Sequence, residues 1–173
     1  MNYAEIKPTD IANGEGVRVS LFVSGCTRKC KNCFNGVAWD FDYGKPFDEG
    51  VQEEILRMLA PDYIAGLSLL GGEPFEPSNQ RALLPFVKKV RERFPNKSIW
   101  CYTGYTYRDG DIEEEQASCE VTKELLGNID VLVDGRFIEA LKDIRLKFRG
   151  SSNQRVIDLK ASIKSKSIVL YLT

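Results

Sequence analysis

The chain has 173 residues, of which 24 are basic and 25 are acidic, so its formal net charge is −1. A chain without a basic excess is not typical of a non-specific nucleic-acid binder, and no apolar run approaches the roughly 20 residues that a membrane-spanning helix needs. The absence of histidine excludes Cys/His zinc sites and catalytic triads that use an imidazole.

The length and the hydrophobic content of 43% predict one globular domain that covers residues 1–173. The first ten residues lack the basic and then apolar pattern of a secretion signal, so we expect a cytoplasmic protein with no membrane or nucleic-acid partner. Because cytosolic thiols stay reduced, clustered cysteines here indicate a metal site in preference to disulfides.

Strands and helices alternate along the sequence. Apolar and β-branched runs predict strands at residues 17–23, 67–70, 98–102, 129–133, 154–159 and 168–172, and apolar periodicity predicts helices at 47–59, 80–94 and 112–126. This α/β pattern favours a mostly parallel sheet with helices outside. Since the chain is too short for eight strand–helix units, the expected fold is an open partial (β/α) barrel.

Polar and glycine-rich segments follow four of the predicted strands, at residues 24–33, 71–74, 103–104 and 134–135. In parallel α/β folds, ligands bind at the carboxyl ends of the strands. We therefore expect these four segments to meet at one edge of the sheet and to form a single site.

Three of the five cysteines form a CxxxCxxC motif at Cys26, Cys30 and Cys33. Three thiolates at this spacing can hold a 4Fe-4S cluster and leave one iron open to a small molecule, since a complete protein shell uses four thiolates. A structural zinc site would need Cys101 or Cys119 as a fourth ligand, and both are expected to lie in the core. A helix with three inert cysteines is the remaining alternative, which the polar residues of the motif disfavour.

A second motif, Gly71-Gly72-Glu73-Pro74, ends the strand predicted at 67–70. Glycines let a backbone approach a ligand closely, and a glutamate can accept hydrogen bonds from a cationic amine. Alone, this motif is also typical of an ordinary turn.

With both motifs in this order, the chain resembles the radical S-adenosylmethionine superfamily. Within it, the chain is most similar to the activating enzymes of anaerobic (class III) ribonucleotide reductase. The matching segments are Gly16-Val-Arg-Val-Ser-Leu-Phe-Val-Ser-Gly-Cys26, Cys33-Phe-Asn35, Asp130-Val-Leu-Val-Asp-Gly-Arg-Phe137 and Phe148-Arg-Gly-Ser-Ser-Asn-Gln-Arg155. The aromatic residue that many superfamily members carry before the third cysteine is replaced here by Asn32.

The resemblance implies two cofactors, a 4Fe-4S cluster on Cys26, Cys30 and Cys33, and S-adenosylmethionine. The residues expected to contact S-adenosylmethionine are Asn32, Cys33, Phe34, Gly71, Gly72 and Glu73. Thr103 and Asp134 are further candidates from their place at strand ends. Asn153 and Arg155 either hold a substrate carboxylate or close the edge of the barrel.

The resemblance also implies an oxidoreductase whose chemistry rests on the cofactors, with no catalytic side chain beyond the cluster ligands. One electron would cleave S-adenosylmethionine, and the resulting radical would take a hydrogen from a glycine of the large reductase subunit. The expected partners are that subunit, docking near residues 24–36 and the C-terminal segment, and a one-electron donor such as flavodoxin. Alternatives are an enzyme like 7-carboxy-7-deazaguanine synthase or pyruvate formate-lyase activase, and a non-enzymatic zinc-binding interaction module.

Overall fold

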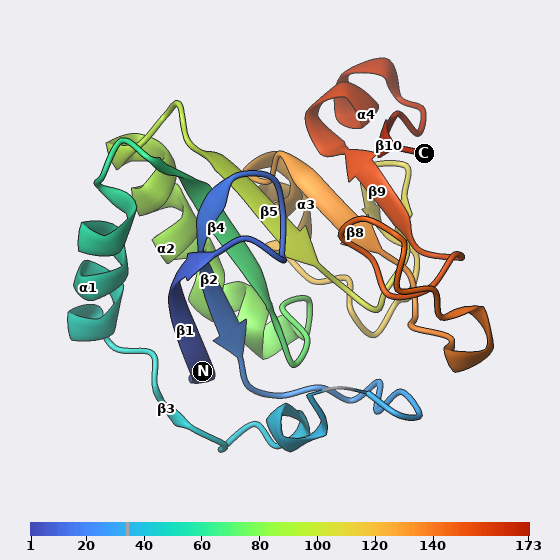
Figure 1. Ribbon diagram of the computed structural model, residues 1–173, viewed down its shortest axis with the longest axis horizontal. Coiled ribbons are helices and arrows are strands. Elements are labelled where there is room, and N and C mark those ends of the chain that lie inside the picture. Colours follow the sequence, from blue (N-terminus) through green and yellow to red (C-terminus); the bar gives the residue numbers. More distant parts are fainter. Residues whose placement is uncertain (34) are drawn as a thin grey trace.

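The computed structural model describes residues 1–33 and 35–173, and an eight-stranded sheet runs through it (Figure 1). The order of the strands across the sheet is β10-β9-β8-β5-β4-β2-β1-β3. Their bounds are Asn2–Asp10 (β1), Val17–Val23 (β2), Lys45–Pro46 (β3), Ile64–Gly71 (β4), Ser98–Tyr102 (β5), Val131–Asp134 (β8), Arg155–Asp158 (β9) and Leu170–Leu172 (β10).

The four central strands are parallel. β2 pairs with β4, β4 with β5, and β5 with β8, each in parallel register. The flanking strands β1, β3, β9 and β10 join in antiparallel pairs. The predicted α/β class with a mostly parallel central sheet is therefore confirmed. Because β2, β4, β5 and β8 point the same way, the segments that follow them leave the same edge of the sheet.

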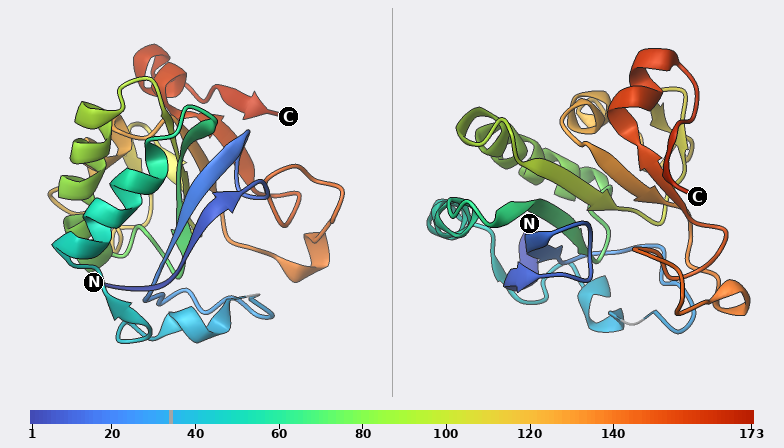
Figure 2. Two further views of the ribbon diagram at one scale, coloured as in Figure 1. Left: turned by 60° about the vertical axis from the view of Figure 1, so that its left-hand side comes forward. Right: turned by 45° about the horizontal axis from the view of Figure 1, so that its top comes forward.

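Helices α1 (Glu49–Leu59), α2 (Pro77–Arg93) and α3 (Thr122–Gly127) lie on the same face of the sheet (Figure 2). Asp48 caps α1, because its side chain accepts the Val51 N–H at 2.9 Å. The opposite face carries a smaller buried cluster of Trp100, Val131, Val133 and Val156.

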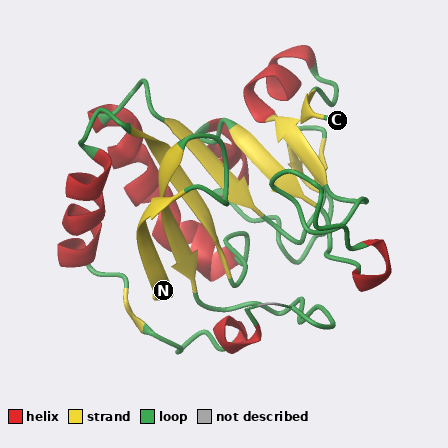
Figure 3. Ribbon diagram, in the orientation of Figure 1, coloured by secondary structure: helices red, strands yellow, loops and turns green. Residues whose placement is uncertain are grey.

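The helix predicted at residues 112–126 is wrong over its first ten residues. These residues instead complete a hairpin of β6 (Tyr107–Arg108) and β7 (Asp111–Ile112) and then form turns (Figure 3). The Glu114 carboxylate accepts the Thr106 N–H at 2.8 Å and the Thr106 hydroxyl at 3.1 Å. These bonds, between residues eight apart in the sequence, favour the turn over the helix that the apolar pattern indicates.

Other elements differ less from the prediction. β1, whose sequence is mostly polar, was not predicted and gains its hydrogen bonds by pairing with β2. Helix α4 (Leu159–Ser165) follows β9 directly and was also missed, although Asp158 caps it by accepting the Ala161 N–H at 2.9 Å. Two short 3-10 helices complete the fold, η1 (Gly36–Trp39) and η2 (Glu139–Leu141). Among the described residues, no helix combines the length and the apolar character needed to cross a membrane.

Candidate functional site

The cysteine loop, residues 24–33, begins where β2 ends. Its first residues pair with the returning chain, since Gly25 N–H donates to Ala38 O at 2.7 Å and Cys26 N–H donates to Trp39 O at 3.1 Å. Cys26 is buried, whereas Cys30 and Cys33 are half-buried, and all three thiols are free.

The loop is not a helix, so the alternative of three inert cysteines on a helix face is wrong. Lys29 and Asn32, which lie between successive cysteines, adopt left-handed conformations with φ of 45° and 56°. Such residues interrupt a right-handed helix. The loop also lacks helical structure in all of its described residues.

The three thiols do not form a ready ligand group. Among the described residues, no three cysteine or acidic side chains are placed together to hold a metal ion. Burial raises the pKa of the Cys26 thiol to about 11, and the nearby Glu73 and Glu76 carboxylates also raise it. The thiolate, and not the protonated thiol, is the form of cysteine that binds metal. Metal binding to thiols is therefore coupled to their deprotonation and to local folding of the segment that carries them.

The donor chemistry of the loop nevertheless fits an iron–sulfur cluster. Eight residues supply three thiols, and thiolates are the usual cluster ligands. Two buried N–H groups, Arg28 Nε in the loop and Trp39 Nε1 in the segment that pairs with it, have no acceptor among the described residues. Such donors are costly to bury without an acceptor, and an anionic sulfur or carboxylate would satisfy them.

The glycine motif lies directly against the cysteine loop. Gly72 N–H donates to Val23 O at 2.7 Å, and Glu73 N–H donates to Gly25 O at 2.7 Å. Gly71 has φ of +114°, and a Cβ atom there would lie 2.5 Å from Val23 N. The structure thus brings the two motifs together, and glycine at position 71 is required by both the backbone conformation and the close approach.

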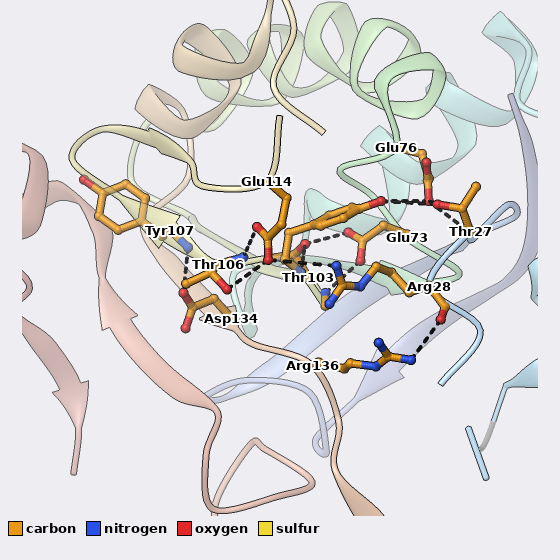
Figure 4. Close-up of polar contacts among 12 residues, drawn as sticks. Thr27, Arg28, Glu73, Glu76, Thr103, Thr106, Tyr107, Glu114, Asp134 and Arg136 are labelled. Atoms are coloured by element: carbon orange, nitrogen blue, oxygen red, sulfur yellow. Dashed lines mark hydrogen bonds and ion pairs between the residues drawn. The ribbon is translucent and has the colours of Figure 1, made fainter. Parts of the chain in front are cut away.

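Glu73 is almost fully buried, at 2% exposure, and links β4 to the end of β5. Its Oε1 atom accepts the Thr103 hydroxyl at 2.7 Å and Phe75 N–H at 2.9 Å, and its Oε2 atom accepts Gly104 N–H at 2.7 Å. Burial raises the pKa of Glu73 to about 7, although these hydrogen bonds oppose the shift. Thr103, a candidate from its place at a strand end, therefore does meet Glu73 (Figure 4).

Sequence reasoning missed Glu76, which holds the cysteine loop. Its Oε1 atom accepts both the N–H of Thr27, at 2.7 Å, and the Thr27 hydroxyl, at 2.6 Å. Tyr105 donates its hydroxyl to the same oxygen at 3.3 Å. Glu76 directly precedes Pro77 at the start of α2, but its side chain makes no cap to that helix. An acidic residue at this position would ordinarily be interpreted as a helix cap, and the sequence gives no sign that it binds the cysteine loop instead.

Arg28 crosses from the cysteine loop to the segment after β5 (Figure 4). Its guanidinium lies 4.6 Å from the centre of the Tyr105 ring, within the range of a cation–π interaction. Its Nη1 atom lies 3.9 Å from Glu114 Oε1. Together with Glu76, this contact fixes the entrance of the cysteine loop against the sheet edge.

Asp134 and Arg155 meet each other and not the cysteine loop. Arg155 donates from Nε and Nη2 to the two oxygens of Asp134, at 2.9 and 2.6 Å, and Asp134 also accepts Tyr107 N–H at 2.8 Å. Asn153 donates its amide to Arg136 O at 2.8 Å. These contacts favour the alternative in which Arg155 and Asn153 close the sheet edge.

Four further residues were singled out from the sequence. Asn32 is exposed, and its amide donates to the Glu139 carboxylate. Phe34 lies outside the described residues. Cys101 is buried in the core as predicted, whereas Cys119 is half-buried in the turn before α3, with its thiol 3.5 Å from Gln80 Oε1.

Comparison with known proteins agrees with this site. The profile of the family described as a 4Fe-4S single cluster domain matches residues 12–157, which contain both motifs. The fold and the site thus define a protein of the 4Fe-4S single cluster class.

More specific relatives are anaerobic ribonucleoside-triphosphate reductase-activating proteins. The protein of that name from Pasteurella multocida is 46% identical over 156 residues, covering 89% of this chain and 95% of its own length. Those of Escherichia coli strain K12 and of the phage T4 are each 40% identical, covering 92% and 90% of this chain and 100% and 93% of their own lengths. The chain belongs to the family of anaerobic ribonucleoside-triphosphate reductase-activating proteins.

Proposed function

We propose that this protein activates an anaerobic ribonucleoside-triphosphate reductase by generating a glycyl radical on it. The observation that carries the proposal is the contact between the cysteine loop and the glycine motif, made through the backbone bonds of Gly72 and Glu73 to Val23 and Gly25. The names of the relatives support the same function.

The proposal assigns a 4Fe-4S cluster to Cys26, Cys30 and Cys33, and S-adenosylmethionine to the adjoining edge of the sheet. When bound, the cluster supplies the single electron that cleaves S-adenosylmethionine. The backbone of Gly71 and Gly72, with Glu73, receives the amino group of the methionyl part, and Asn32 and Phe34 contribute to the rest of the pocket. Cys33 serves both as a ligand and as a wall of that pocket.

The residues around this edge then have separate tasks. Glu76 and Tyr105 hold Thr27, which fixes the direction in which the chain enters the cysteine loop. Thr103 and Gly104 hold the carboxylate of Glu73 at the end of β5. Fixed donors and acceptors of this kind orient a cofactor without reorganisation during the reaction.

For the fold, we propose that residues 1–173 form one radical S-adenosylmethionine domain, an open partial (β/α) barrel. The parallel strands β2, β4, β5 and β8 with helices on one face support this assignment. A barrel with an open side suits a macromolecular substrate, because a glycine loop of the reductase can reach the sheet edge that carries the cysteine loop. We further propose a cytoplasmic location and a one-electron donor such as flavodoxin.

The test is anaerobic reconstitution of the protein with iron and sulfide, followed by reduction with dithionite. With S-adenosylmethionine and the cognate reductase, we expect methionine, 5′-deoxyadenosine and a glycyl-radical signal in electron paramagnetic resonance. Alanine at Cys26, Cys30 or Cys33 should abolish all three, whereas Cys119→Ser, at a half-buried thiol outside the loop, should retain them. Bound zinc in place of iron, with no product, would contradict the proposal and support the zinc module.

A further inference from the structure

Two segments of the chain, residues 27–33 and 136–149, carry an excess of positive charge, and we call them the basic rim. Together they hold eight basic and two acidic residues, a formal charge of +6. Since the whole chain has a net charge of −1, the other residues carry a formal charge of −7. The near-neutral net charge of the chain therefore conceals a local excess of positive charge in these two segments.

The two segments of the basic rim lie side by side although about a hundred residues separate them. The Asn32 amide donates to the Glu139 carboxylate, and Arg136 Nη2 donates to Arg28 O at 3.4 Å. Figure 2 (right) shows the cysteine loop and the segment after β8 along the same edge of the molecule. The basic rim therefore consists of most of the cysteine loop and a segment that lies beside it, and does not form a remote patch.

The second segment is held as an ordered lobe. Ser152 N–H donates to Leu141 O at 2.9 Å, and Asp143 N–H donates to Gly150 O at 3.2 Å. These bonds tie the segment to the residues that follow it, and Lys142, Arg145 and Lys147 are all exposed. The charges are thus displayed on a defined surface.

Exposed aliphatic side chains lie among these charges. Ile144 is 91% exposed, and Ile138 and Leu141 are each 41% exposed. Val37, which follows the cysteine loop, is 63% exposed. Exposed aliphatic side chains among charged ones are typical of a protein–protein interface, whereas nucleic-acid binding by phosphate contacts does not require exposed aliphatic groups.

We propose that the basic rim and the aliphatic side chains within it dock an acidic surface of the reductase. This inference rests on the proposed function, because the reductase is the macromolecule that must approach the cysteine loop. Complementary charge would steer the encounter, and burial of Ile144 and its neighbours would slow dissociation.

Two variants test the docking surface. Lys142→Glu/Lys147→Glu reverses two exposed charges for which the described residues show no ion pair, and Ile144→Asp replaces the most exposed aliphatic side chain of the segment with a charged one. The matched controls are Lys89→Glu/Lys164→Glu, on α2 and α4, and Ile11→Asp. Ile11 is 76% exposed and lies in the connection between β1 and β2. This connection precedes β2, whereas the cysteine loop follows β2, so the two lie at opposite ends of that strand (Figure 1).

The dissociation constant for the cognate reductase is measured by sedimentation at low and high salt. We expect each test variant to bind at least about tenfold more weakly at low salt and each control to stay within about twofold. The unmodified protein should lose affinity as salt rises, more steeply than Lys142→Glu/Lys147→Glu. Unchanged binding in both test variants would overturn the proposal.

Two further readouts separate this proposal from the proposed function. Cleavage of S-adenosylmethionine with dithionite and without reductase should be equal in all variants, and its absence in the unmodified protein would contradict the proposed function alone. The glycyl-radical yield, also with dithionite, should fall in the test variants. Full yield would indicate that the rim serves the protein electron donor, and a loss of self-association with unchanged reductase binding would indicate an interface between copies. Either result would overturn the proposal.

Discussion

Glu73 and Glu76, three residues apart, have different roles at the sheet edge that carries the cysteine loop. Glu73 joins the glycine motif to β5 through Thr103 and Gly104, whereas Glu76 reaches across to Thr27 in the cysteine loop. Both carboxylates are buried, at 2% and 5% exposure, so each depends on its hydrogen-bond donors to offset the cost of burial.

We predict that Glu76→Ala frees the entrance of the cysteine loop. Hydrogen bonds to a charged group contribute about 1.5 kcal/mol or more, so iron release to a chelator should accelerate at least about tenfold. Thr27→Val, which removes the hydroxyl and keeps the N–H, should have a smaller effect in the same direction. Glu115→Ala, at an exposed acidic residue, is the control, and an equal rate for Glu76→Ala and Glu115→Ala would contradict the prediction.

The buried carboxyl of Glu73 predicts a pH dependence of stability. Its pKa is raised by burial from the ordinary 4.5 to about 7, so between these values the folded state holds a proton that the unfolded state releases. The free energy of unfolding should therefore fall as pH rises from about 4.5 to 7, by about 3 kcal/mol from this group.

Urea unfolding of the cluster-free protein at several pH values checks this prediction. Glu73→Gln should be less stable by an offset, because its amide cannot accept all three hydrogen bonds, and should lose this part of the pH slope. If the difference in unfolding free energy between the two proteins is independent of pH across this range, the assignment of the slope to Glu73 is wrong.

At the residue level, the sequence was most informative where chemistry requires a fixed spacing. The spacing of the cysteines and the order of the two motifs were enough to predict a contact between the motifs, which the structure shows. Glu76, Tyr105 and Glu114 could not be found in this way, because most of their partners are distant in sequence and no local motif distinguishes them from other acidic or aromatic residues.

Among the elements, the turn at Gly71-Gly72 leaves no room for a side chain at either glycine. A Cβ atom at Gly71 would lie 2.5 Å from Val23 N, and one at Gly72 would lie 2.6 Å from Gly25 O. Both distances are shorter than atoms allow, so a side chain would push the glycine motif away from the cysteine loop.

We predict that Gly71→Ala lowers the free energy of unfolding by at least about 2 kcal/mol, from backbone strain and the steric overlap together. Gly127→Ala is the matched control, because no atom lies within 4 Å of its Cβ position and it ends α3 without a positive φ. The control should be neutral or stabilising by about 0.5 kcal/mol. Equal stabilities for the two variants in denaturant titrations would contradict this account of the turn.

Element prediction failed where tertiary hydrogen bonds overrule local pattern. The segment from Ile112 to Val121 has helical spacing, yet Glu114 bonds to Thr106 and holds it as a turn. β1 was not predicted as a strand because its sequence is mostly polar and lacks apolar alternation. Its backbone hydrogen bonds to β2 hold it in the sheet. The pattern within each segment does not identify its partner, which is Thr106 for Glu114 and β2 for β1.

For the whole molecule, the parallel centre of the sheet explains why one site forms. β2, β4 and β5 deliver the cysteine loop, the glycine motif and Thr103 to the same edge, and this arrangement was predictable from strand–helix alternation alone. The antiparallel flanks and the placement of residues 136–149 beside the cysteine loop were not predictable, because they depend on long-range contacts such as that of Asn32 with Glu139.

The central claim is that the cysteine loop holds a cluster with an iron open to S-adenosylmethionine. Electron paramagnetic resonance of the anaerobically reconstituted, dithionite-reduced protein tests it most directly, in the absence and presence of S-adenosylmethionine. The account predicts a reduced 4Fe-4S signal whose shape changes when S-adenosylmethionine is added. A cluster signal that S-adenosylmethionine leaves unchanged, or no cluster signal with zinc bound in its place, would contradict the account.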